Sequence, residues 1–107
     1  MFEEEWQALV FDDVLEVKNS EHGDQRIHLR DIKEIAIQTN DSGPFDSDVI
    51  WLVSDGTSVI SFPLGAKGES DVLAWFQKFE GFDNEQFISA MGSTENKIFI
   101  LWKSIKA

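Results

Sequence analysis

Carboxylates are abundant in this chain of 107 residues, but other side chains that could carry acid–base or nucleophilic chemistry are few in kind. Histidine occurs only at His22 and His28, and the chain has no cysteine and no tyrosine. A Ser-His-Asp triad or a metal-hydrolase arrangement would therefore depend on His28 together with an Asp or Glu. The lack of cysteine also excludes disulfides, thiol nucleophiles and thiolate metal sites. We therefore predict that the protein is not an enzyme, and an enzyme that uses His28 is the third class of hypothesis.

The segment RIHLR carries the only cationic stripe of the sequence. Alternate residues of a strand point to the same side, so Arg26, His28 and Arg30 would share one face and the two intervening apolar residues the other. Such a stripe could bind an anion or a carboxylate of a partner. The alternative is a solvated face that pairs with neighbouring acids. These three residues are the candidate anion-binding residues.

An acidic loop, DSGPFDSD at residues 41–48, places three aspartates around a Gly-Pro turn. Calcium takes about six to eight oxygen ligands, and the spacing here lacks the glycine and glutamate positions of an EF-hand loop. We therefore predict no metal site and no cofactor, although the sequence leaves open whether the loop binds a cation. Phe45 at the loop tip is a candidate protein contact, unless it folds back onto the core.

The stretch EGFDNEQFISAMGSTEN suits either a polar site or the frame of a short helix. Asp83 is predicted to accept from the backbone N–H of Gln86, which reaches back as in a capping box. Phe82 and Phe87 then form a hydrophobic staple, and Gly92 is expected in the left-handed conformation at the helix end. The remaining polar residues, together with those of the following turn, are candidates for a recognition surface: Asn84, Glu85, Thr94, Glu95 and Asn96.

Short strands separated by Gly- and Asp-rich breaks are expected to position these residues. The runs ALVF and VLEV flank Asp12 and Asp13 and predict two strands around a tight turn. In IAIQ the alternation puts Ile35 and Ile37 on one side of a further strand. Residues 49–53, VIWLV, are apolar at every position, which predicts a strand covered on both faces.

The second half of the chain begins with a hairpin signal and then changes its apolar period. Asp55-Gly56 predicts a type I′ turn into the strand SVISF. Ser70 would then cap a helix that ends before Gly81. The apolar stripe of this helix is expected to lie on the sheet and consists of Val72, Leu73, Trp75, Phe76 and Phe79. The short helix that Asp83 is predicted to cap and the apolar strand IFILW are the last two elements expected in the chain.

These elements predict a single α+β domain over residues 1–107. We expect an antiparallel twisted sheet or partial barrel of six or seven strands, with two helices in the C-terminal half and a final strand. A chain of this length can bury one sizeable core, and no repeat, linker or low-complexity segment divides it.

Two segments resemble a group of small, uncharacterised bacterial proteins. They are GPFDSDVIWLV and GFDNEQFISAMGSTENKIFILW, which together span roughly residues 39–102. The group has no established activity, so the resemblance implies no catalytic residue.

The segment IHLRDIKEI, the central hairpin and the helix after it also resemble bacterial pleckstrin-homology-like domains, which implies a PH-like fold. The chain departs from that family in two ways. A further helix and strand follow the helix, and VFDDVL carries Asp12 and Asp13 where lipid-binding members carry basic residues. The resemblance therefore does not imply phosphoinositide binding.

The formal charge is -11, from 20 acidic and nine basic residues. Such a chain repels phosphate backbones and anionic lipids, so we expect no nucleic-acid and no membrane partner. The first residues include three glutamates where a secretory signal would be basic, and no run of about 18 apolar residues follows, so the expected location is the cytoplasm.

Acidity also suits a basic protein partner, because complementary charge speeds association. The leading hypothesis is a non-enzymatic protein-interaction module of unknown specificity, and the alternative is an acidic immunity-type protein that neutralises a basic toxin. A homodimer is a further hypothesis, because four Trp and nine Phe exceed what one small core needs.

Overall fold

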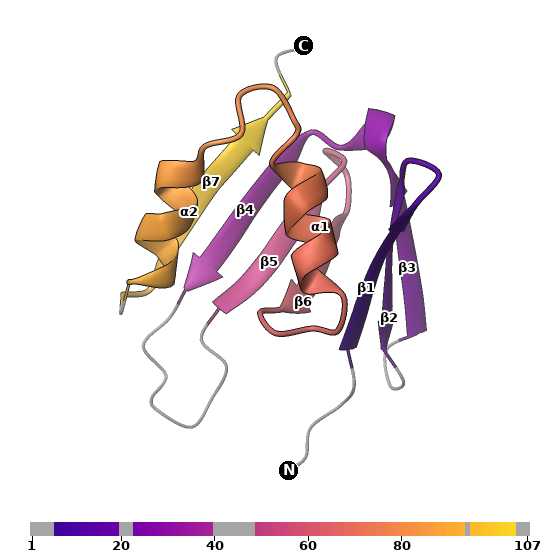
Figure 1. Ribbon diagram of the computed structural model, residues 1–107, viewed down its shortest axis with the longest axis horizontal. Helices are drawn as coiled ribbons and strands as arrows, with labels where there is room; N and C mark the ends of the chain where they lie inside the picture. The colour runs from indigo at the N-terminus through magenta and orange to yellow at the C-terminus, as the bar shows by residue number, and fades with distance from the viewer. Residues whose placement is uncertain (1–5, 20–22, 40–48, 94, 105–107) are drawn as a thin grey trace.

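The computed structural model describes residues 6–19, 23–39, 49–93 and 95–104. The described elements confirm the predicted α+β class, with seven strands, two α-helices in the C-terminal half and a final strand. Figure 1 shows them in chain order: β1 (Trp6–Phe11), β2 (Val14–Asn19), β3 (Gly23–His28), the 3₁₀ helix η1 (Leu29–Asp31), β4 (Glu34–Thr39), β5 (Val49–Ser54), β6 (Val59–Pro63), α1 (Glu69–Phe76), α2 (Asn84–Met91) and β7 (Lys97–Lys103).

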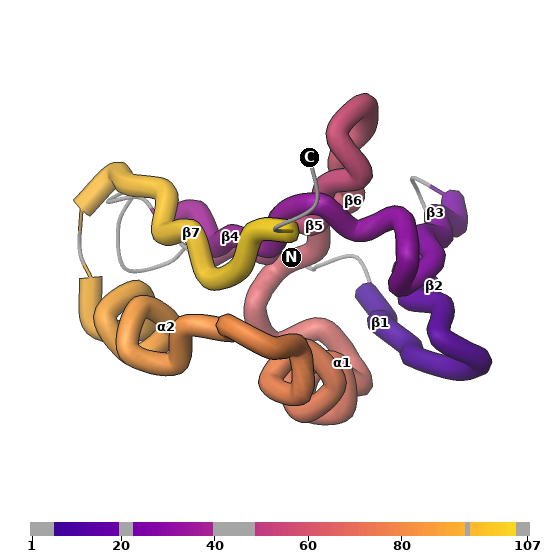
Figure 2. The backbone as a smooth tube through the Cα atoms, turned by 90° about the horizontal axis from the view of Figure 1, so that it is seen from above, coloured from indigo at the N-terminus to yellow at the C-terminus, as the bar shows by residue number. Residues whose placement is uncertain are grey.

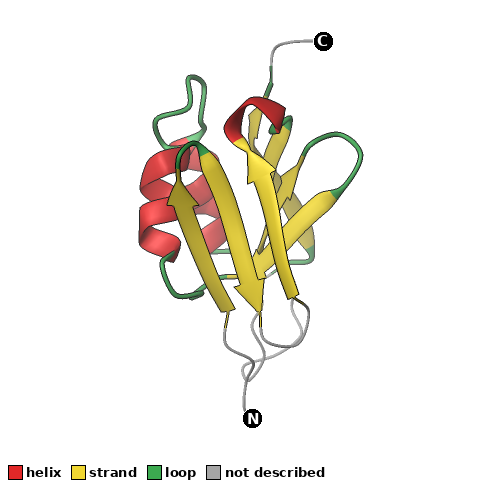
Figure 3. Cartoon of the chain, turned by 90° about the vertical axis from the view of Figure 1, so that its right-hand side faces the viewer, coloured by secondary structure: helices red, strands yellow, loops and turns green. Residues whose placement is uncertain are grey.

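The strands form two open antiparallel sheets. One sheet has the order β1-β2-β3 and the other β6-β5-β4-β7. In Figure 3 the three-stranded sheet lies in front and strands of the other sheet cross behind it. Because β6 and β7 are the two edges of the four-stranded sheet, the connection between them must cross that whole sheet, and this connection contains both helices.

The core lies between the two sheets and under the two helices. The predicted alternation in β4 is confirmed, since Ile35 and Ile37 are fully buried. Trp51 of β5 is also fully buried, and its ring stacks on Phe62 and Phe87 at centroid distances of 6.0 and 5.8 Å. The helix stripe is confirmed as a core contact, because all five of its residues are buried or pack against the buried cluster.

Helix α1 begins at Glu69, one residue before the predicted cap Ser70. Gly68 takes the cap position with φ 88°, and a Cβ there would lie 2.3 Å from the carbonyl oxygen of Ala8. The chain can therefore enter the helix at this point only with glycine. Glu69 turns its carboxylate inward, where it accepts from Trp51 Nε1 at 2.6 Å and from the backbone N–H of Gly65 at 3.0 Å.

Helix α2 has the predicted cap but a different end. Asp83 accepts from the backbone N–H of Gln86 at 3.0 Å, as predicted. The backbone N–H of Asp83 donates to the Leu101 carbonyl at 2.8 Å, so strand β7 takes the place that a returning Gln86 side chain would occupy in a capping box. Gly92 has φ -98°, so the predicted left-handed conformation is wrong, and its N–H instead bonds carbonyls of the last helical turn.

The hairpin between β5 and β6 differs from the predicted type I′ turn. Asp55 and Gly56 do lie in a hairpin, but β5 ends at Ser54 and β6 begins at Val59, so the loop is longer than a two-residue type I′ turn. The backbone N–H groups of Thr57 and Ser58 both donate to the Asp55 carboxylate at 2.8 Å, which closes this wider loop.

Among the described turns, the one between β1 and β2 has positive φ at both central residues. Phe11 pairs with Val14 there, and Asp12 and Asp13 have φ values of 51° and 60°. The predicted tight turn at these aspartates is confirmed, and it adopts left-handed conformations without glycine, which aspartate tolerates better than most residues.

The strand predicted over residues 26–30 is shorter than expected. β3 ends at His28, and Leu29 begins η1 with its backbone N–H bonded to the Asp13 carbonyl at 2.8 Å. Arg30 therefore lies on a 3₁₀ helix and not on the strand that holds Arg26.

Candidate functional site

One face of the four-stranded sheet carries aliphatic side chains that point away from the core. Residues directly opposite in antiparallel strands point to the same side of a sheet. Ala36 of β4 lies opposite Leu52 on β5 and Ile100 on β7. Two positions along, Gln38 lies opposite Ile50 and Ile98. We call this surface the open sheet face and define it by its apolar residues: Ala36, Ile50, Leu52, Ile98 and Ile100.

These residues alternate along each strand with residues of the core, which fixes their direction. Ile98 is 53% exposed, and Ile50, Leu52 and Ile100 are partly exposed. Ala36 is buried to 4% exposure, as expected for a methyl group that lies in register between the larger Leu52 and Ile100. The side chains form two aliphatic columns, on β5 and β7, with Ala36 between them in one row and the exposed Gln38 in the next.

Neither α-helix covers this face. Figure 2 shows α1 and α2 on the same side of β4 and β7, and the open sheet face is the opposite side. The prediction that VIWLV is covered on both faces is therefore wrong for the described part of the chain. β5 is an inner strand of the sheet, but Ile50 and Leu52 keep part of their surface exposed.

Charges on the open sheet face balance one another. Glu34 of β4 lies opposite Lys103 of β7, one row beyond Ala36. The neighbouring positions on β5 and β6 are Ser54 and Val59, and Val59 is 55% exposed. Among the described residues of this face, one acid lies beside one base, whereas the whole chain has a formal charge of -11. The surface is suited to apolar contact.

The free edge of β7 is protected against the addition of another strand. Lys97 and Lys103 stand at its two ends, and Leu101 is an extra residue that interrupts the pairing with β4. The carbonyl of Leu101 is occupied by the backbone N–H of Asp83. Terminal lysines and a bulge are devices that prevent edge-to-edge pairing. At this end of the sheet, a partner can therefore bind the open sheet face more readily than the edge of β7.

Only two of the three residues of the predicted cationic stripe lie on one strand. Arg26 and His28 share the outer face of β3, and Arg30 lies on η1, where it is exposed. Arg26 Nε donates to Glu16 Oε2 at 3.0 Å, and the Glu16 side chain is 5% exposed while that of Arg26 is 67% exposed. This geometry fits the alternative in which a cation pairs with a neighbouring acid.

The candidate recognition residues around α2 fall at its two ends. Asn84 and Glu85 are exposed in the first turn, and Asn84 Oδ1 accepts from Gln77 Nε2 at 3.0 Å. Glu95 and Asn96 are exposed beyond the other end, about 12 Å along the helix axis. The Glu95 carbonyl accepts from Thr39 Oγ1 at 2.6 Å. The structure therefore does not bring these residues to one point.

Several predicted positions lie outside the described residues. They are Phe45, Thr94, His22 and the acidic loop at 41–48. Among the described residues, no group of three or more His, Cys, Asp or Glu side chains is arranged to hold a metal ion. None of the described helices is long and apolar enough to cross a membrane.

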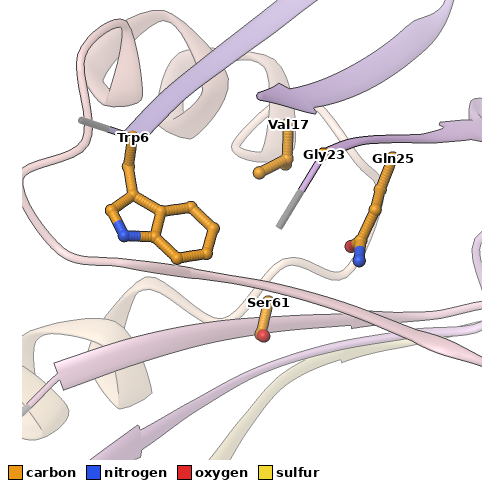
Figure 4. A pocket seen from close by; sticks show the side chains of 5 residues that line it. All are labelled: Trp6, Val17, Gly23, Gln25 and Ser61. Atoms are coloured by element: carbon orange, nitrogen blue, oxygen red, sulfur yellow. The ribbon is translucent and has the colours of Figure 1, made fainter. Parts of the chain in front are cut away.

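A cavity of about 350 Å³ lies where the three-stranded sheet meets β6 (Figure 4). Its lining combines an indole, an amide and a hydroxyl with small residues: Trp6, Val17, Gly23, Gln25 and Ser61. Among the described residues, no acidic or basic side chain lines this cavity.

Sequence reasoning missed the open sheet face, although the signal was present. VIWLV and IFILW are apolar at consecutive positions, and a strand with that pattern presents apolar side chains on both faces. Comparison with family models, curated proteins and solved structures finds no match to this chain.

Proposed function

We propose that this protein is a non-enzymatic protein-interaction module that binds its partner on the open sheet face. The observation that carries the proposal is Ile98, which is 53% exposed near the start of the edge strand β7 and lies on the same face as Ile100 of β7 and Ile50 of β5. Contiguous apolar surface of this kind marks interaction sites in monomeric proteins. The neutral charge of the face supports apolar contact, since charged residues are depleted at interface centres.

The chemistry of the described residues supports the non-enzymatic part of the proposal. His28 is exposed on β3 opposite Val14, and no acid lies opposite it in the strand register. The described lining of the cavity beside β6 contains no titratable side chain. General acid–base catalysis requires at least one titratable side chain within hydrogen-bond reach of the bound substrate.

An immunity-type function is a narrower form of the same proposal. The formal charge of -11 favours a basic partner, and a toxin of basic character would meet that condition. Protection of cells from a toxin encoded beside the gene would support this form, and an isolated gene would count against it while leaving the general proposal in place.

The proposal is tested by two single substitutions at similarly exposed isoleucines. Ile98→Gln changes the open sheet face, and Ile88→Gln changes α2, where Ile88 is 69% exposed. A tagged chain is purified from its host at low salt, and partners are quantified for the original chain and both variants. We expect a stoichiometric partner that is lost with Ile98→Gln and retained with Ile88→Gln. Equal recovery with both variants would refute the open sheet face as the site.

A further inference from the structure

We infer that the open sheet face receives an amphipathic helix with basic flanks, supplied by the partner protein. This inference rests on the proposed function and adds the kind of partner. It follows from the shape of the face, the protection of the β7 edge and the charge of the chain.

The spacing of the aliphatic columns fits the width of a helix. The columns on β5 and β7 are separated by β4, which places them about 10 Å apart at ordinary strand spacing. An α-helix with its side chains is about 10–12 Å across. A helix that lies along β4 would set its apolar stripe over Ala36, with Leu52 and Ile100 on its two sides. Gln38 and Glu34 lie one row away in either direction and would meet polar positions of the helix.

The length of the face sets the length of the helix. β4 has six residues, which span about 20 Å at ordinary strand rise. A helix of about 13 residues has that length and presents apolar side chains at i, i+3, i+4, i+7 and i+8. The other face of the same sheet already accepts this kind of contact, since Phe87 of α2 packs against Trp51.

An added strand and a second copy both fit less well. Strand addition at β7 is opposed by the terminal lysines, the extra Leu101 and the Asp83 hydrogen bond. The other edge of the sheet, β6, lies against the three-stranded sheet. A second copy brings another formal charge of -11, so the two chains repel each other. A helix with lysine or arginine beside its apolar stripe is attracted by the same charge.

Synthetic peptides test the inference directly. The probe is a 14-residue peptide of leucine and lysine with leucine at helical spacing. A peptide of the same composition with strict alternation tests strand-like binding, and a leucine–glutamate peptide with helical spacing tests charge. Binding is measured by calorimetry at about 0.15 M salt, where exposed charges are largely screened beyond about 8 Å. We expect the helical basic peptide to bind most tightly.

The same two variants locate the binding. We expect Ile98→Gln to weaken the helical basic peptide about tenfold, because an isoleucine buried by the helix is replaced by a polar side chain. Ile88→Gln should leave its affinity unchanged. Thermal unfolding of both variants verifies that they are folded. Equal weakening by both variants, or tighter binding of the alternating peptide, would overturn the inference.

Three further outcomes show whether the inference and the proposed function stand or fall together. If no peptide binds but Ile98→Gln still abolishes recovery of the cellular partner, the helix inference fails and the proposed function stands. If light scattering finds a dimer that Ile98→Gln dissociates, the occupant is a second copy and the inference is overturned. If no peptide binds and Ile98→Gln retains the partner, both fail.

Discussion

The two faces of the four-stranded sheet both carry large apolar side chains, but the described chain covers them unequally. On the covered face Trp51 is fully buried beneath α1 and α2, whereas on the open sheet face Ile98 is 53% exposed. The difference arises from the connection between β6 and β7, which carries both helices across the same side of the sheet. The covered face contributes mainly to stability, and the open face has apolar surface to offer a partner.

The largest expected contrast is between Trp51→Ala and Ile98→Gln. Removing the buried indole leaves a cavity among Phe62, Phe76 and Phe87, and we expect a loss of about 3–5 kcal/mol in the free energy of unfolding. Ile98→Gln should change that free energy by less than about 0.5 kcal/mol, as expected of an exposed position. Denaturant unfolding followed by circular dichroism measures both.

Trp51→Phe is the matched control for the covered face. It keeps an aromatic ring but removes the Nε1–H that donates to Glu69, so part of the destabilisation should remain. If Ile98→Gln destabilised the protein as much as Trp51→Ala, the conclusion that the covered face contributes more to stability than the open sheet face would be wrong.

Two glycine substitutions test how the helices are held over the covered face. Gly68→Ala would place a Cβ 2.3 Å from the Ala8 carbonyl oxygen and would also strain a φ of 88°. Gly81→Ala strains a similar φ of 92° but meets no heavy atom within 4 Å. We expect about 1–2 kcal/mol for Gly81→Ala and about 3 kcal/mol or more for Gly68→Ala.

The difference between these variants isolates the close approach of β1 to the start of α1. Thermal unfolding of the two proteins under the same conditions measures it. If both variants lost the same stability, the close contact would be tolerated by local adjustment, and the position of α1 would not depend on it.

The outer face of the three-stranded sheet offers a smaller test. Arg26→Met removes the cation that pairs with the buried Glu16 carboxylate, and we expect a loss of about 1–2 kcal/mol. The exposure of the Arg26 side chain keeps this value well below that of a fully buried ion pair. Lys18→Met removes a positive charge from the same face and is the control. A smaller loss for Arg26→Met than for Lys18→Met would show that the pair is not stabilising.

Local rules predicted those features whose causes lie within a few residues. The Asp83 cap, the alternation of Ile35 and Ile37, and the tight turn at Asp12 and Asp13 all follow from short-range chemistry. The α+β class followed because the change of apolar period from two to about 3.6 is visible in the sequence.

The errors arose where a distant segment decides the local conformation. The Ala8 carbonyl places Gly68, and not Ser70, at the helix start. The Leu101 carbonyl takes the Asp83 N–H that a capping box would use. The open face was hidden for the same reason: an apolar strand predicts two apolar faces, but which face the helices cover depends on the path of the chain between β6 and β7.

The smallest expected effect concerns the turn that joins β5 and β6, the strands that meet at Ser54 and Val59. Hydrogen bonds from the backbone N–H groups of Ser58 and then Thr57 hold the pKa of Asp55 below its ordinary value of 3.8. A carboxylate whose pKa is lowered by folding contributes stability above its unfolded pKa and loses that contribution as the pH falls through the folded value. The loss should therefore occur below about pH 3.8.

Amide hydrogen exchange of Thr57 and Ser58 as a function of pH measures this effect, with Asp55→Asn as the control. After correction for intrinsic exchange, we expect protection of both amides to fall as Asp55 is protonated, and to be independent of pH in the variant because its amide oxygen accepts without titrating. Amides of β4 beneath the helices should keep their protection over the same range. If the amides of the turn and of β4 lost protection at the same pH, acid would be unfolding the whole sheet together. The turn beside the open sheet face would then not respond separately from the covered face.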